Sequence, residues 1–180
     1  MENWIVFMDL DGSVWDNKNI SAAVLPFKRT SQDSISDLTG KETHLLPGSR
    51  EFLKWVKEQN GFLCSLTWNI PERAIKALHA FQMLDLFDFH RISITPRKDL
   101  GIASMISELN ERGIKIPQSS MFYLDDRDLH MMEITRKFPE LRFMHLWKNF
   151  HSFDEASQYI LKFKDNGTSH QSFSASELDH

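Results

Sequence analysis

The chain has 180 residues, of which 41% are hydrophobic, so it has room for one ordinary domain with a buried core. Its formal net charge of -4 gives no overall cationic field, which argues against nucleic acid or an anionic membrane as a partner. A single cysteine excludes an intramolecular disulfide, and no apolar run approaches the roughly 20 residues of a membrane-spanning helix. The N-terminal residues also lack the features of a secretory signal, so we expect a soluble, cytoplasmic protein, monomeric or weakly dimeric.

Short apolar runs alternate with amphipathic stretches along the chain, which is the pattern of a parallel sheet built from β-α-β units. We therefore predict an α/β fold, a doubly wound, Rossmann-like parallel sheet. Asn69 is expected to cap the second helix, because the fixed φ of Pro71 suits a first helical turn. The expected strands are residues 4–9, 62–67, 89–94, 121–125 and 142–146, and the expected helices are residues 49–59, 71–84, 102–109, 129–138 and 153–163.

Residues 17–46 interrupt this rhythm, because about 30 residues separate the first strand from the first helix where roughly 2 to 6 are usual. Leu38-Thr39-Gly40-Lys41 is typical of a hairpin turn between two short β-prone pieces. We expect a small β flap here, inserted into a single domain that spans residues 1–164. Residues 165–180 lack an apolar face, so we expect a flexible tail.

An acidic pair, Asp9 and Asp11, follows directly on the first strand and precedes Gly12. Open α/β sheets bind ligands at the carboxyl ends of their strands, and side chains two apart on an extended chain point to one face. Carboxylates held close together repel one another, so either a cation lies between them or one has a raised pKa. Both outcomes suit catalysis, although an Asp-Gly turn that merely ends a strand uses the same residues.

Polar residues also follow the second and third strands. Thr67 stands before Trp68 and Asn69, where a hydroxyl and free backbone N–H groups make a cradle for an anion. Lys98 stands at a helix start, where the helix dipole disfavours a cation, so we expect an anion beside it. Each feature alone is more often structural, since threonine commonly ends strands and loop lysines are commonly solvated.

A second acidic pair, Asp125 and Asp126, ends the fourth strand. Oxygen ligands brought together from two strands suit Mg²⁺, which takes one or two protein carboxylates and keeps several waters. Asp126 could instead cap the following helix. The joint pattern is more specific than any member, because acid pair, hydroxyl, lysine and acid pair follow successive strands in this order.

In this order the residues resemble the four motifs of the haloacid dehalogenase (HAD) superfamily of phosphohydrolases. Gly12 stands where an aromatic residue is usual, Thr67 replaces serine, and His130 stands where asparagine is common. The similarity is greatest to the small magnesium-dependent phosphatases, which act on phosphotyrosine or on phosphorylated sugar adducts such as fructosamine 6-phosphate. The segments that carry the resemblance are Asp9-Leu10-Asp11-Gly12-Ser13-Val14 with Trp15, Pro26-Phe27, Asp37-Leu38-Thr39-Gly40, Leu46-Pro47, Thr67, Lys98 and Asp125-Asp126.

The resemblance implies a Mg²⁺-dependent phosphomonoester hydrolase. Asp9 would attack phosphorus and form an aspartyl phosphate, and Asp11 would act as general acid and then as general base. Thr67 and Lys98 complete the implied catalytic set. The implied phosphate-binding residues are Thr67, Trp68, Asn69 and Lys98, and the implied metal ligands are Asp9, the main-chain carbonyl of Asp11, Asp125 and Asp126, the last of which would orient the metal shell.

Two other functions use similar residues. A phosphotransferase or mutase with the same nucleophile usually needs a large cap to exclude water. The insertion at residues 17–46 is too small for such a cap. A receiver-type signalling domain has its acid pair near the start and its phosphorylated aspartate after a middle strand, whereas here the Asp-x-Asp pair comes first and the double aspartate last. Hydrolysis is therefore preferred, on a phosphotyrosine protein or on a phosphorylated sugar or other small metabolite.

Overall fold

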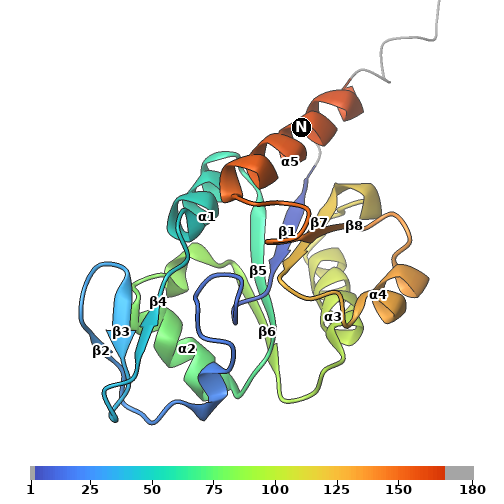
Figure 1. Ribbon diagram of the computed structural model, residues 1–180. Helices are drawn as coiled ribbons and strands as arrows, with labels where there is room; N and C mark the ends of the chain where they lie inside the picture. The colour runs from blue at the N-terminus through green and yellow to red at the C-terminus, as the bar shows by residue number, and fades with distance from the viewer. Residues whose placement is uncertain (1–2, 169–180) are drawn as a thin grey trace, which may run out of the picture.

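A computed structural model describes the backbone of residues 3–168, and a five-stranded parallel sheet forms its centre (Figure 1). The strand order is β6-β5-β1-β7-β8, so the chain moves outward from β1 through β5 to β6 and then returns to β7 and β8. Ligands bind open α/β sheets at such a reversal. The predicted doubly wound parallel sheet is confirmed. Its strands are β1 (Ile5–Met8), β5 (Phe62–Trp68), β6 (Phe89–Ser93), β7 (Met121–Asp125) and β8 (Arg142–His145).

Helices cover both faces of the sheet (Figure 1). Side chains alternate along β1, so Val6 and Met8 pack into the core beneath α1, α2 and α5, while Ile5 and Phe7 pack beneath α3 and α4. All four side chains are fully buried, as expected of a strand covered on both faces. The helices are α1 (Ser49–Glu58), α2 (Pro71–Ala80), α3 (Lys98–Glu111), α4 (Met131–Lys137) and α5 (Phe153–Thr168), with short 3-10 turns at Ile20–Ala22 (η1), Leu84–Leu86 (η2) and Gln118–Ser120 (η3).

All five predicted helices are present, with shifted ends. α3 begins earlier than predicted, at Lys98, and α5 continues to Thr168. The domain boundary expected after residue 164 therefore falls inside α5. Residues 169–180 of the expected flexible tail lie outside the described residues. Within the described part of the chain, no helix is both long enough and apolar enough to cross a membrane.

The segment between β1 and α1 contains a small antiparallel sheet of β2 (Lys28–Arg29), β3 (Ser34–Ser36) and β4 (Glu42–His44). β3 and β4 form the predicted hairpin, and Gly40 supplies the positive φ of its turn. Ile20 and Ile35 are fully buried in the main core, so the flap is fixed to the domain by apolar packing. In Figure 1 the flap lies beside α2, on the side of the sheet where the strands end.

Candidate active site

The carboxyl ends of the central strands bring Asp9, Asp125 and Lys98 together. Asp9 directly follows β1, and its backbone N–H donates to Leu124 O at 3.0 Å, which fixes it beside the end of β7. Lys98 opens α3, and its Nζ donates to Asp9 Oδ1 at 2.8 Å and to Asp125 Oδ2 at 2.5 Å. These two carboxylates are the anions expected beside Lys98.

Asp9 carries an oxygen without a partner. The side chain is only 1% exposed, and its Oδ2 is buried without a hydrogen bond from any described residue. Burial raises the pKa of Asp9 from 3.8 to about 7, against the opposing effect of Lys98 and with a further contribution from Asp125. A buried, unpaired carboxylate oxygen is costly, so this position suits a ligand that supplies positive charge.

Asp125 is held by more partners than Asp9. The hydroxyl of Tyr123 donates to Asp125 Oδ2, and the backbone N–H of Arg127 donates to Asp125 Oδ1 at 2.9 Å. Tyr123 lies two residues earlier on β7 and therefore shares its face of the sheet. The alternation of side chains along the strand can be inferred from the sequence. The sequence nevertheless did not identify Tyr123 as a site residue, because a tyrosine within an apolar strand is expected to pack in the core.

Three carboxylates form a candidate metal centre. Ligand atoms of Asp9, Asp125 and Asp126 all lie within 4.8 Å of one another. Hard oxygen donors and the unpaired Oδ2 of Asp9 both fit Mg²⁺. Asp126 is positioned by the loop after β1, because Ser13 Oγ accepts its N–H at 3.0 Å and Lys18 Nζ lies 2.7 Å from its Oδ2.

The carboxylate of Asp11 does not join this cluster. Its Oδ1 accepts the indole N–H of Trp15 at 2.7 Å, and its Oδ2 accepts the backbone N–H of Ile20 at 3.1 Å. The chain leaves the extended conformation here, with turn hydrogen bonds closing onto Leu10 O, and Asp11 still lies near enough to Asp9 to contribute to the raised pKa of Asp9. Burial raises the pKa of Asp11, although the bonds from Trp15 and Ile20 oppose that rise.

Thr67 lies at the end of β5 within a polar network. Its Oγ1 accepts Asn69 Nδ2 at 2.9 Å, and Asn69 Oδ1 accepts Ser21 Oγ at 2.6 Å. The expectation that Asn69 caps α2 was wrong: Ile70 is the N-cap residue, and its N–H donates to Ser21 Oγ at 2.8 Å. The backbone N–H of Asn69 donates to Ser93 O, so these two N–H groups are not free for an anion.

Trp68 faces outward beside this network. Its indole N–H donates to Ile94 O at 3.0 Å, and its ring meets His130 edge-on with 6.4 Å between centroids. His130 is buried, and its Nε2 has no hydrogen-bond partner among the described residues. Because the indole N–H is already used, Trp68 offers a nearby ligand its ring surface.

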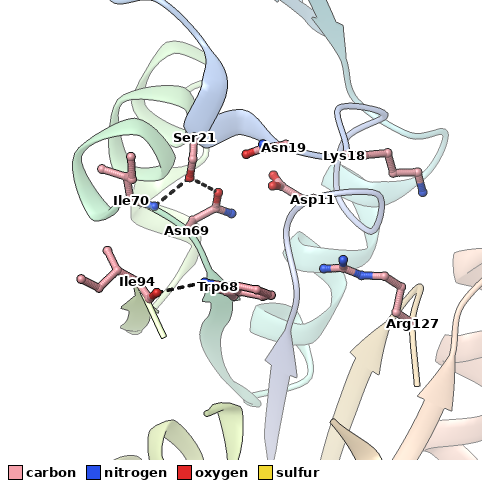
Figure 2. Close-up of a pocket in the computed structure, with 9 residues that line it drawn as sticks. All are labelled: Asp11, Lys18, Asn19, Ser21, Trp68, Asn69, Ile70, Ile94 and Arg127. Atoms are coloured by element: carbon pink, nitrogen blue, oxygen red, sulfur yellow. Dashed lines mark hydrogen bonds between the residues drawn. The ribbon is translucent and has the colours of Figure 1, made fainter. Parts of the chain in front are cut away.

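A pocket of about 350 Å³ opens beside the carboxylate of Asp11 (Figure 2). Three apolar side chains form part of its wall, and the other lining residues are polar or charged, including two cationic residues of the surrounding loops. Lys18 and Arg127 were not identified from the sequence, because they lie in loops without a periodic pattern. The lining residues are Asp11, Lys18, Asn19, Ser21, Trp68, Asn69, Ile70, Ile94 and Arg127.

Gly12 allows the loop after β1 to approach Asp126. Its φ is +75°, and a Cβ there would lie 2.5 Å from both Asp126 Oδ2 and Lys18 Nζ. We expect Gly12→Ala to push these groups apart and to weaken Mg²⁺ binding by about 10-fold or more, as changes beside metal ligands commonly do. Isothermal titration calorimetry with Mg²⁺ measures this effect.

Gly40→Ala is the matched control. Gly40 has a φ of +85°, but nothing lies within 4 Å of the added Cβ. Both variants therefore carry the conformational cost of a left-handed alanine, about 1–2 kcal/mol, and only Gly12→Ala carries the clash. Equal Mg²⁺ affinities for the two variants would show that the approach of Gly12 to Asp126 is unimportant.

Comparisons with known proteins agree with this arrangement at the level of the fold. No known family model and no curated protein matches the sequence. The structure resembles a HAD-superfamily hydrolase from Ehrlichia chaffeensis with a TM-score of 0.61 and 14% identity, over 91% of this chain and 99% of that one. The chain has the fold of the HAD-superfamily hydrolases.

Two further structures share this fold. The HAD domain of the effector protein Lem4 from Legionella pneumophila, an inactive mutant, gives a TM-score of 0.61 and 14% identity, over 96% of this chain and 100% of that one. The N-terminal part of a Bacteroides fragilis protein, containing a phosphatase domain complexed with Mg, gives a TM-score of 0.56 and 18% sequence identity over 90% of this chain. This chain spans only 40% of that Bacteroides chain.

Proposed function

We propose that this chain is a Mg²⁺-dependent phosphomonoester hydrolase in which Asp9 is the nucleophile. The observation that carries the proposal is the buried Asp9 carboxylate, with Lys98 on one oxygen and no partner on the other. It stands at the carboxyl end of the central strand, beside Asp125. The Bacteroides fragilis phosphatase domain complexed with Mg, which shares the fold, supports the same chemistry.

The first step would be an in-line attack by an Asp9 carboxylate oxygen on phosphorus. A bond forms between that oxygen and phosphorus, and the bond from phosphorus to the ester oxygen breaks with its electrons on the leaving group. Asp11 would protonate the departing oxygen, for which its raised pKa suits it. Lys98 Nζ and Thr67 Oγ1 would donate to the phosphoryl oxygens, where negative charge increases in the transition state.

The second step would hydrolyse the aspartyl phosphate. Asp11, now ionised, would remove a proton from water as the water oxygen attacks phosphorus. The bond between phosphorus and the Asp9 oxygen then breaks, which releases inorganic phosphate and restores both carboxyl groups. One residue can serve in both directions because the proton that it gives to the leaving group in the first step is replaced by a proton taken from water in the second.

Asp9, Asp125 and Asp126, together with the main-chain carbonyl of Asp11, would hold Mg²⁺. When bound, this ion offsets the repulsion between the carboxylates and the anionic substrate. The three clustered carboxylates and the unpaired Asp9 Oδ2 are the structural support for that assignment.

Hydrolysis is preferred over phosphoryl transfer to a second substrate. The flap contains three strands of two or three residues each, which is little structure with which to exclude water. The pocket beside Asp11 is open to a phosphotyrosine side chain of a protein or to a phosphorylated sugar or other small metabolite.

Phosphate release from a panel of phosphomonoesters tests the proposal. We expect release with Mg²⁺, loss of release after exhaustive chelation, and recovery when Mg²⁺ is added back, with Mn²⁺ or Co²⁺ as poorer substitutes. The reason is that the carboxylates of Asp9, Asp11, Asp125 and Asp126 otherwise crowd negative charge around an anionic substrate. Full turnover after chelation would contradict the metal requirement.

Two controls sharpen this experiment. Asp154→Asn, on the exposed start of α5, should keep the wild-type dependence on Mg²⁺, whereas Asp125→Asn should require a much higher concentration. An added alcohol acceptor separates the alternatives, because a phosphotransferase would phosphorylate the acceptor and release little inorganic phosphate.

A further inference from the structure

Arg127 places a cation in the pocket beside Asp11, and its one ion pair among the described residues is long. Its nearest carboxylate is Asp126, but Lys18 already lies 2.7 Å from Asp126 Oδ2, whereas Arg127 Nε is 4.0 Å from Oδ1. Among the described residues, the guanidinium of Arg127 donates no hydrogen bond. Figure 2 shows it extending into the pocket from the side opposite Ile94, while Lys18 extends away from the centre.

The wall facing this cation is apolar and exposed. Trp68, Ile70 and Ile94 are 44%, 40% and 71% exposed. The bond from the Trp68 indole N–H to Ile94 O and the edge contact with His130 hold the ring in one orientation. A flat apolar group packed on this wall would remove exposed hydrophobic surface from water.

The pocket lies on the leaving-group side of the candidate active site. Asp11, the proposed general acid, lines it, but Asp9, Thr67 and Lys98 do not. A phosphoryl group on Asp9 would therefore lie outside the pocket, and the departing oxygen would face into it. The volume of about 350 Å³ is at the low end for ligand pockets, which suits a single ring or one side chain.

We infer that this pocket holds the leaving group and that Arg127 selects a phosphomonoester whose leaving group is a flat apolar body bearing a second anionic group. The inference rests on the phosphatase function proposed above. The guanidinium would bind a carboxylate through two parallel hydrogen bonds, which an amide of the same shape cannot accept. Because Arg127 is 46% exposed on its side chain, solvent limits the gain, and we expect a preference of about 10-fold.

Two isosteric substrates test this selection. The ratio of kcat/KM for 3-carboxyphenyl phosphate to that for 3-carbamoylphenyl phosphate is measured at saturating Mg²⁺ in the wild type, Arg127→Gln and Arg136→Gln. We expect the wild type and Arg136→Gln to prefer the carboxylate about 10-fold. Arg127→Gln should bring this ratio to near 1 and leave the carbamoyl ester almost unaffected. Arg136 is the control because it is exposed in the last turn of α4, away from the pocket.

Two outcomes of this substrate comparison would show that Arg127 does not select the leaving group. A wild type without preference overturns the inference. An equal loss on both esters in Arg127→Gln overturns it too, because it would place Arg127 on the phosphoryl group instead.

Failure of the proposed function would appear differently, as no hydrolysis of either ester. In that case the affinities for 3-carboxybenzylphosphonate and 3-carbamoylbenzylphosphonate, measured by calorimetry, test the inference without turnover. Tighter binding of the carboxylate by the wild type, lost in Arg127→Gln, supports it. Equal affinities, or no binding of either compound, overturn it.

Discussion

Asp9→Asn is expected to abolish turnover of every phosphomonoester. Asparagine keeps the shape of the side chain and an oxygen that can accept from Lys98, but it is not a nucleophile toward phosphorus and it removes a charged metal ligand. No acyl phosphate should form, so intact-protein mass spectrometry after rapid quenching should show no phosphoryl adduct. Asp154→Asn is the control. Residual wild-type turnover in Asp9→Asn would exclude Asp9 as the nucleophile.

The same variant should change how stability depends on pH. The pKa of Asp9 rises from 3.8 to about 7 on folding, so between these pH values the folded state binds more protons than the unfolded state. Asp9 therefore contributes a fall in stability as pH rises through that window in the metal-free protein. Asp9→Asn cannot ionise and should lose that part of the slope. Melting temperatures from pH 4 to pH 8 measure it, and identical slopes would contradict the assigned pKa.

The sheet and its helices could be predicted because their signals are local and strong. β7 is an apolar run of four residues that ends at Asp125 as expected, and all five residues of the strand are buried. The order of polar residues after β1, β6 and β7 also predicted that Asp9, Lys98 and Asp125 would lie near one another, since parallel strands end at one edge. Lys98 pairing with Asp9 and Asp125 follows from that topology.

Side-chain directions near the site could not be predicted in the same way. The orientation of Asp11 depends on Trp15 and Ile20, which become its partners only after the chain turns behind β1. The N-cap residue of α2 is Ile70 in place of Asn69, and both residues bond to Ser21, which lies 48 residues before Asn69 in the sequence and belongs to the flap segment. Such partners come from loops, whose path is determined by tertiary packing.

Buried charge is concentrated in the candidate site, and one cation offsets much of it. Asp9 and Asp125 are almost fully buried, and Lys98 is the described basic side chain that bonds to both. Burial disfavours the ammonium, yet the two carboxylates together raise the pKa of Lys98 above its usual value. The site therefore depends on Lys98 for stability as well as for its proposed contact with phosphate.

Lys98→Met is expected to damage activity and stability together. Methionine keeps the apolar length of the side chain and removes its charge, so in the proposed mechanism the negative charge that develops on the phosphoryl oxygens would lose the cation of Lys98. We expect kcat/KM to fall by about 100-fold or more. Lys115→Met, at an exposed position before β7, should leave kcat/KM within about 2-fold, as surface changes usually do.

The stability of Lys98→Met distinguishes charge loss from general damage. Two buried carboxylates would face each other without a cation, and breaking such a buried pair costs about 3–5 kcal/mol. Because Mg²⁺ bound by these carboxylates would replace part of the lost charge, the melting temperature of Lys98→Met should rise on adding Mg²⁺ by more than that of the wild type or Lys115→Met. A cavity or packing defect would lower the melting temperature without this added dependence on Mg²⁺. Wild-type kcat/KM in Lys98→Met would show that Lys98 does not act on phosphate, and a melting temperature equally responsive to Mg²⁺ in all three proteins would show that its charge does not balance the metal-binding carboxylates.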